Sequence, residues 1–179
     1  MVCFISIPMQ KRGKLRDTLS LTMNSNQMLA SLVDVEEKIN HVWVYTTPLN
    51  GWQLSHAILY HAYVVLETNK YFWSLEKNSE ELVLQRSKNA IYVKDYCHGK
   101  KRALLLGHSK PSQYKHQWSN LCLKDLFDYL FTEDELSKTY NWLEDNCQGF
   151  ADRIYNYISN NKRRSSLDYF GPTNVGLKN

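Results

Sequence analysis

The chain has few of the residues that build nucleotide-binding loops. Its 179 residues include only seven glycines and four prolines, and no glycine-rich string matches a loop that cradles a phosphate. No apolar run approaches the roughly 18 residues of a membrane-spanning helix. The apolar residues at the N-terminus precede the basic residues at 11–14, the reverse of a secretory signal. We therefore expect a soluble protein that uses no cofactor.

The cysteines show no paired spacing. Cys3, Cys97, Cys122 and Cys147 lie far apart and form no Cys-x-x-Cys motif. This spacing favours reduced thiols in the cytoplasm over a disulfide framework. The cysteine and histidine residues between 97 and 116 also lack the paired spacing of structural zinc sites, so no metal is expected.

Composition and charge are typical of one packed domain. Hydrophobic residues make up 43% and aromatic residues 13% of the chain, enough for a substantial core. The net charge of +4 is small, and permits contact with nucleic acid without arguing for it. We predict a single domain over residues 1–164, with an irregular or weakly strand-like lead-in over 1–25 and a flexible tail over 165–179. The oligomeric state stays open.

Hydrophobic patterns predict helices on either side of a β-rich centre. The predicted helices cover residues 26–39, residues 123–131, a segment after the capping box Thr132-x-x-Glu135, and a final segment after residue 146. The predicted strands are 41–47, 53–68, 71–76, 82–85 and 90–96. Connections this short exclude crossovers, so we expect an antiparallel meander. The predicted fold class is α+β, an antiparallel sheet meander packed against helices.

The last predicted helix carries a candidate nucleophile. Apolar residues recur there at steps of three and four, which indicates an amphipathic helix facing a core: Phe150, Ala151, Ile154, Tyr155 and Ile158. Asp145 or Asn146 can cap its start. Cys147 then lies in the first turn, where free amides and the helix dipole favour a thiolate.

A base and an orienting acid are predicted on a β-hairpin. If Asn69-Lys70 is its tip, paired residues have numbers that sum to 139, and His61 and Glu76 become diagonal neighbours on one face. Glu76 can then orient His61, which completes a nucleophile, base and acid with Cys147. His56 has the opposite parity and points away unless a bulge intervenes, so it is kept as the competing base.

The order of these features resembles that of the circularly permuted papain-like proteins. A histidine strand comes first, a second polar residue follows on the next strand, and Asn146-Cys147-x-x-Phe150 opens a later helix. This superfamily includes NlpC-type proteins, the lecithin:retinol acyltransferase family with its H-box and NC motifs, and certain picornavirus-type 2A proteins. The resemblance implies a permuted papain-like topology, with the catalytic helix C-terminal to the sheet.

The same resemblance implies a cysteine-dependent hydrolase or acyltransferase. In that role Cys147 is the nucleophile, His61 the general base and Glu76 the third member, acting on the carbonyl of a peptide, an isopeptide or a lipid ester. Asn141 lies six residues before Cys147, the offset at which papain-like enzymes carry an oxyanion-hole glutamine, and it is a candidate for that support.

One alternative belongs to a different functional class. The chain could be a non-enzymatic interaction protein on the same scaffold, which contacts a protein or nucleic acid through the basic stretch from residue 94 to 116. Aromatic residues are interleaved with this stretch, as in surfaces that stack nucleobases. We interpret the stretch as a solvated loop, which does not favour a nucleic-acid partner.

Overall fold

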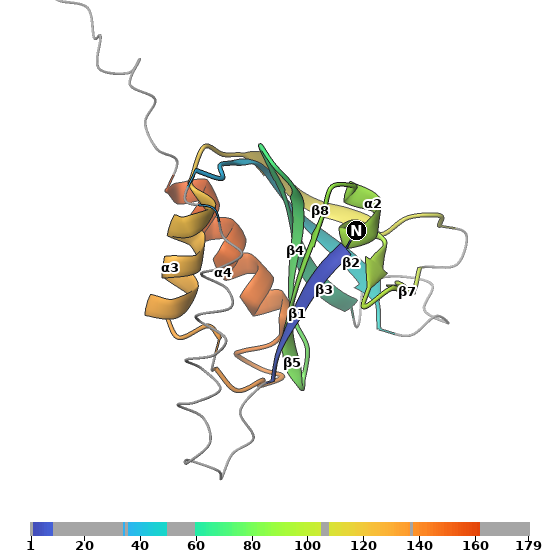
Figure 1. Cartoon of the computed structure of the whole chain (residues 1–179). Helices are drawn as coiled ribbons and strands as arrows, with labels where there is room; N and C mark the ends of the chain where they lie inside the picture. Colours follow the sequence, from blue (N-terminus) through green and yellow to red (C-terminus); the bar gives the residue numbers. More distant parts are fainter. Residues whose placement is uncertain are drawn as a thin grey trace, which may run out of the picture.

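The architecture is α+β, an antiparallel sheet of six strands with three helices (Figure 1). The structure is a computed structural model that describes residues 2–8, 34, 36–49, 60–104, 108–136 and 138–161, and these counts apply to those residues. The sheet order is β1-β5-β4-β3-β2-β8. Within this part of the chain, no helix is long and apolar enough to cross a membrane.

The order of the strands in the sheet differs from their order along the chain. The sheet strands are β1 (Val2–Pro8), β2 (Ile39–Pro48), β3 (Tyr60–Thr68), β4 (Phe72–Lys77), β5 (Glu81–Ser87) and β8 (Ser112–Trp118). A small separate hairpin pairs β6 (Tyr96–Cys97) with β7 (Lys100–Lys101). The helices are α2 (Ala90–Lys94), α3 (Leu123–Thr132) and α4 (Cys147–Asn160).

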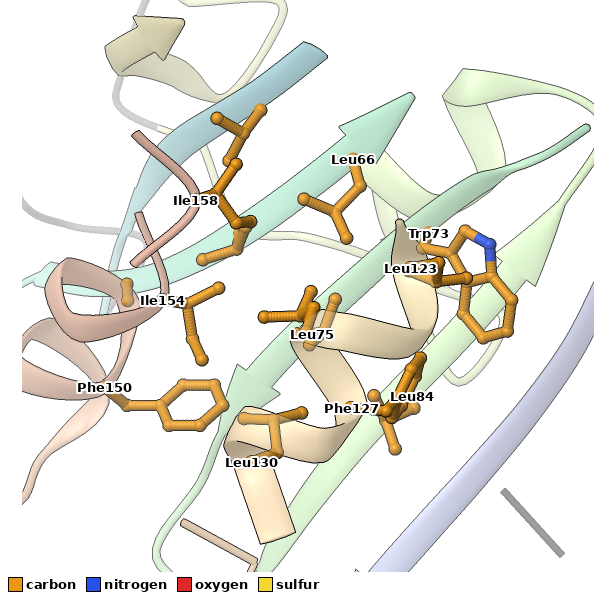
Figure 2. Packing of buried hydrophobic residues seen from close by; sticks show 14 of the residues in the cluster. Leu66, Trp73, Leu75, Leu84, Leu123, Phe127, Leu130, Phe150, Ile154 and Ile158 are labelled. Carbon is orange, nitrogen blue, oxygen red and sulfur yellow. The ribbon is translucent and has the colours of Figure 1, made fainter. Parts of the chain in front are cut away.

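The two long helices cover one face of the sheet. Figure 1 shows α3 and α4 on one side of the strands, with α2 and β7 on the other side. In Figure 2, Leu66 and Leu75 from neighbouring strands point toward Phe150 and Ile154 of α4. All four side chains are fully buried, and each such burial contributes about 1.5–3 kcal/mol before entropy is counted. The predicted amphipathic stripe of the last helix is therefore the face that packs on the sheet.

A smaller cluster lies on the other face. Tyr63 and Val65 of β3 pack there with Val93 of α2. The Tyr63 hydroxyl donates to the Lys94 carbonyl at 2.6 Å, and the guanidinium of Arg102 lies 3.8 Å from the centre of the Tyr63 ring. These contacts fix α2, and the chain that follows it, against the sheet.

The β3–β4 register agrees with the prediction from the sequence. Val64 pairs with Leu75 and Val65 with Ser74, so the paired numbers sum to 139 as expected. Because side chains alternate along a strand, Leu75 and Lys77 face α4 while Ser74 and Glu76 face the other way.

Two predicted elements after the hairpin differ from the structure. Residues 90–96, predicted as a strand, form α2 and then β6, because Asn89 caps the helix by accepting from the amide of Ile91 at 3.0 Å. No helix starts at Thr132, which is the last residue of α3. The predicted capping partner Glu135 instead accepts two hydrogen bonds from Arg153, at 2.6 and 2.8 Å.

The two N-terminal predictions have different outcomes where they can be compared. Lys38 bridges to Cys122 and β2 begins at Ile39, so the end of the predicted helix over 26–39 is not helical. In the lead-in, Val2–Pro8 forms a regular edge strand that pairs with β5. Residues 9–33, 35 and the predicted tail over 165–179 lie outside the described residues.

Candidate active site

The nucleophile candidate is the first residue of α4. Asn146 is the N-cap: its side chain accepts from the amide of Gly149 at 2.9 Å, and its carbonyl accepts from Phe150 at 3.0 Å. Of the two predicted caps, the structure therefore uses Asn146. Cys147 is 4% exposed, and its position in the first turn places it at the positive end of the helix dipole.

His61 and Glu76 are joined by a direct hydrogen bond. His61 Nε2 lies 2.8 Å from Glu76 Oε2, across the hairpin whose register the sequence predicted. Glu76 is almost completely buried, and His61 is mostly buried. Because Nε2 is committed to the carboxylate, Nδ1 is the ring nitrogen that remains for a second partner.

The second partner of His61 is the Cys147 thiol. The imidazole and the thiol interact closely enough for each to shift the pKa of the other. The thiol donates to the carbonyl oxygen of Tyr60, the residue before His61, with the sulfur 3.9 Å from that oxygen. The Ala62 amide and the Tyr140 hydroxyl also help to lower the pKa of Cys147.

The two groups shift each other's protonation in opposite directions. Burial raises the pKa of Cys147, but its contact with His61 outweighs burial and holds the pKa below its ordinary value. Burial lowers the pKa of His61, but hydrogen bonds to Cys147 and Glu76 outweigh it and raise the pKa to about 9. Both shifts favour a thiolate beside an imidazolium, the reactive form of a thiol nucleophile.

Arg102 holds the acid of this group in place. Its Nη1 and Nη2 donate to the two oxygens of Glu76 at 2.8 and 2.9 Å, and its Nε donates to the Lys94 carbonyl at 3.1 Å. Burial raises the pKa of Glu76, but the bonds from His61 and Arg102 outweigh it and lower the pKa. Glu76 is therefore ionised, and its carboxylate is fixed from two sides.

Two of these residues were missed by sequence reasoning. Arg102 lies within a basic stretch, where nothing distinguishes a buried arginine from solvated ones. Tyr140 is seven residues before Cys147, in an irregular segment without periodicity. Burial, followed by the charge of Cys147, raises the pKa of Tyr140 to about 12, so its hydroxyl stays protonated near neutral pH.

Two other predicted residues are not placed in this group by the structure. His56 falls outside the described residues, so its position relative to Cys147 is not described. Asn141 forms a bridge with Asp145, and its side chain accepts from the Leu143 amide at 3.0 Å. The Asn141 amide is therefore engaged in the turn before α4, and its oxyanion role stays a prediction.

A charged network holds the segment that leads into α4. Lys77 of β4 is completely buried and forms an ion pair with Asp145 at 2.9 Å. Arg153 of α4 binds the same Asp145 oxygen and also both oxygens of Glu135. Lys138 completes the group with a contact to Glu135 at 2.7 Å. Asp145 precedes the N-cap, so this network positions Cys147.

The other cysteines lie in unlike surroundings. All four are free thiols. Burial, together with the nearby Glu76 carboxylate, raises the pKa of Cys97 to about 12. Cys122 is the N-cap position of α3 and makes no side-chain capping bond. The pKa of Cys147, in contrast to that of Cys97, lies below its ordinary value.

Comparison of the chain with known protein families, with curated proteins and with solved structures found no match in any of the three.

Proposed function

We propose that the protein is a cysteine-dependent hydrolase or acyltransferase that uses Cys147, His61 and Glu76. The observation that carries this proposal is that the Cys147 sulfur lies 3.9 Å from the carbonyl oxygen of Tyr60, directly before His61, while His61 is hydrogen-bonded to the buried Glu76. A structural cysteine is normally inert and buried among apolar groups. Here the surroundings of the thiol, His61 foremost among them, lower its pKa despite its burial.

The order of elements supports a permuted papain-like topology. The base lies on β3, the acid on the adjacent antiparallel strand β4, and the nucleophile on a helix 71 residues after the acid, counted from Glu76 to Cys147. Helix α4 packs on the sheet face that contains Leu66 and Leu75. We propose that the acid–base pair of the sheet and the start of this helix form one site, as in that superfamily.

The reaction follows from this geometry. The Cys147 thiolate attacks the substrate carbonyl carbon, and the oxyanion accepts hydrogen bonds from amides of the first turn of α4. The imidazolium of His61 gives its proton to the leaving group as the carbon–heteroatom bond breaks, which leaves a thioester. Water or another acceptor then loses a proton to His61 and attacks the thioester, which restores the thiol site. Glu76 holds one tautomer of His61 throughout.

Selective alkylation tests the proposal. Iodoacetamide near neutral pH should label Cys147 faster than Cys3, Cys97 or Cys122, measured site by site with peptide mass spectrometry. His61→Ala should slow Cys147 labelling by about tenfold or more, because one unit of pKa changes the thiolate fraction about tenfold. The matched control is His116→Ala on β8, which removes an imidazole that stacks on Trp43.

The same experiment separates the enzyme from the interaction protein. Equal labelling of all four thiols, or an identical rate in His61→Ala, contradicts the enzyme and favours the non-enzymatic alternative. If Cys147 is selectively reactive, electrophilic probes built on peptide, ubiquitin-like and lipid-ester scaffolds then identify the acyl class. The scaffold that labels Cys147 fastest in the wild type, and slowly in His61→Ala, reports the substrate class.

A further inference from the structure

An open cleft of about 540 Å³ meets the candidate active site at His61 and Glu76. One wall is the end of β2, where Pro48 and Leu49 supply apolar surface. The opposite wall is the β6–β7 hairpin with the two residues that follow it, and its polar lining includes Cys97, His98, Lys100, Lys101 and Arg102. Any ligand in this cleft therefore lies beside the imidazole of the proposed base.

The basic wall is held rigidly by Gln85. This side chain is 1% exposed; its amide nitrogen donates to Ser74 Oγ and to the Tyr96 carbonyl, both at 3.0 Å. Its amide oxygen accepts from the backbone of His98, also at 3.0 Å. His98 has a positive φ of 49° and Gly99 one of 73°, which makes a tight turn. The hairpin is thus fixed before a ligand arrives.

The charges of the cleft do not cancel. The charge of Arg102 is paired with Glu76 through two hydrogen bonds, and Glu81 Oε1 lies 3.1 Å from His98 Nε2. Lys100 and Lys101 remain, both exposed at the rim. The cleft lining therefore carries three permanent cations against two carboxylates. Low-dielectric walls strengthen such a field inside a cleft.

We propose that this cleft binds an anionic group, a carboxylate or a phosphate, on the substrate whose carbonyl reacts with Cys147. This inference rests on the proposed function, and it names the substrate class as acyl compounds with a negative charge near the scissile bond. Lys100 and Lys101 supply the charge that attracts this group. The apolar side chains of Pro48 and Leu49 contact the carbon chain that carries it.

A pair of small electrophiles tests this charge preference. Iodoacetate and iodoacetamide have the same leaving group and differ by one negative charge. The ratio of the iodoacetate rate to the iodoacetamide rate at Cys147 should fall by about threefold or more in Lys100→Gln/Lys101→Gln, because two positive charges at the rim are lost. The matched control, Lys88→Gln/Lys124→Gln, removes two cations that do not line the cleft and should keep the wild-type ratio. All four substitutions are on the surface and leave folding unchanged.

Two competing anions distinguish the sources of the charge. Inorganic phosphate and succinate, each at matched ionic strength, should slow iodoacetamide labelling of Cys147 in the wild type and in the control variant. Protection by phosphate alone indicates a phosphate, and protection by succinate alone indicates a carboxylate. Protection by both indicates a general anion subsite. Protection by neither, or equal protection in Lys100→Gln/Lys101→Gln, overturns the proposal.

The failures of the two proposals are distinguishable. Rapid, selective labelling of Cys147 with a rate ratio that does not change in Lys100→Gln/Lys101→Gln overturns the anion subsite and leaves the cysteine enzyme intact. Equal labelling of all four thiols overturns the enzyme itself. Cys97 does not confuse the readout, because its raised pKa keeps it a thiol near neutral pH and peptide mass spectrometry resolves each site.

Discussion

Glu76 and Lys77 are consecutive residues of β4 whose side chains leave the strand on opposite faces. Glu76 accepts hydrogen bonds from His61 and Arg102 on one face, and Lys77 forms an ion pair with Asp145 on the other. Asp145 lies two residues before Cys147. The end of a single strand therefore holds both the proposed base and the segment that begins the nucleophile helix, so their relative position depends on few mobile parts.

Glu76→Gln should destabilise the fold and slow the alkylation of Cys147. The substitution keeps the shape of the side chain but leaves Arg102 as a buried charge without its partner, a change that costs about 3–5 kcal/mol. Urea unfolding measures this loss. Glu81→Gln, which removes a carboxylate that is one-third exposed, should cost less than about 1 kcal/mol. A double variant, Glu76→Gln/Arg102→Met, should recover part of the loss. Equal costs for the two single variants contradict the buried pair.

The pH dependence of Cys147 labelling should report its contact with His61. The pKa of the thiol is lowered and that of His61 is raised to about 9, so the thiolate–imidazolium pair persists over the interval between them. Labelling should therefore remain fast at pH values below the ordinary thiol pKa of about 8.5. In His61→Gln the midpoint should move up toward or beyond that value. A midpoint that is the same in both proteins contradicts the ion pair.

Local patterns were sufficient to predict the hairpin and the nucleophile helix. The period-two alternation and a two-residue tip set the β3–β4 register, and the spacing of Phe150, Ile154 and Ile158 set the buried face of α4. Both signals are confined to neighbouring residues. Once the register is fixed, the contact between His61 and Glu76 follows from strand geometry rather than from any further signal.

The contacts that hold the site are non-local and were not predictable in this way. Arg102 binds Glu76 across 26 residues of chain, and a single sequence does not show which of many basic residues makes that contact. Helix α2 has only five residues, too few for a helical period, and its β-branched residues favoured a strand. Its helical form depends on the Asn89 cap and on the burial of Val93 against the sheet.

Asp145→Asn should make stability depend on pH in a specific way. Burial already lowers the pKa of Lys77, and Asp145 opposes that effect, so its loss should lower the pKa further. The unfolded chain then binds more protons than the native one, and the free energy of unfolding rises with pH up to the ordinary lysine pKa of about 10.4. Urea unfolding between pH 7 and about 10 measures the slope.

Lys77→Met is the matched control for this experiment. It replaces a completely buried cation by an apolar side chain of similar length, and Asp145 keeps its contact with Arg153. Replacement of buried ions by packed apolar groups is often neutral or stabilising. Lys77→Met should therefore cost less than Asp145→Asn at pH 7 and lack the added pH slope, as should the double variant. If the free energy of unfolding of Lys77→Met also rises steeply with pH, the slope seen in Asp145→Asn does not come from Lys77.

Tyr140→Phe should raise the pKa of the Cys147 thiol without destabilising the fold. The Tyr140 hydroxyl donates a hydrogen bond to the Cys147 sulfur and thereby lowers the pKa of the thiol, whereas its ring packs edge to face on Trp142 at 5.6 Å. Phenylalanine keeps the ring and removes only the donor. The midpoint of Cys147 labelling should rise, by less than in His61→Gln, because one neutral donor is lost rather than an ionic partner. The free energy of unfolding, measured with urea, should change by less than about 1.5 kcal/mol. Tyr92→Phe, on the exposed side of α2, should leave the midpoint where it is, and an equal shift in both variants would show that the hydroxyl of Tyr140 does not act on the sulfur.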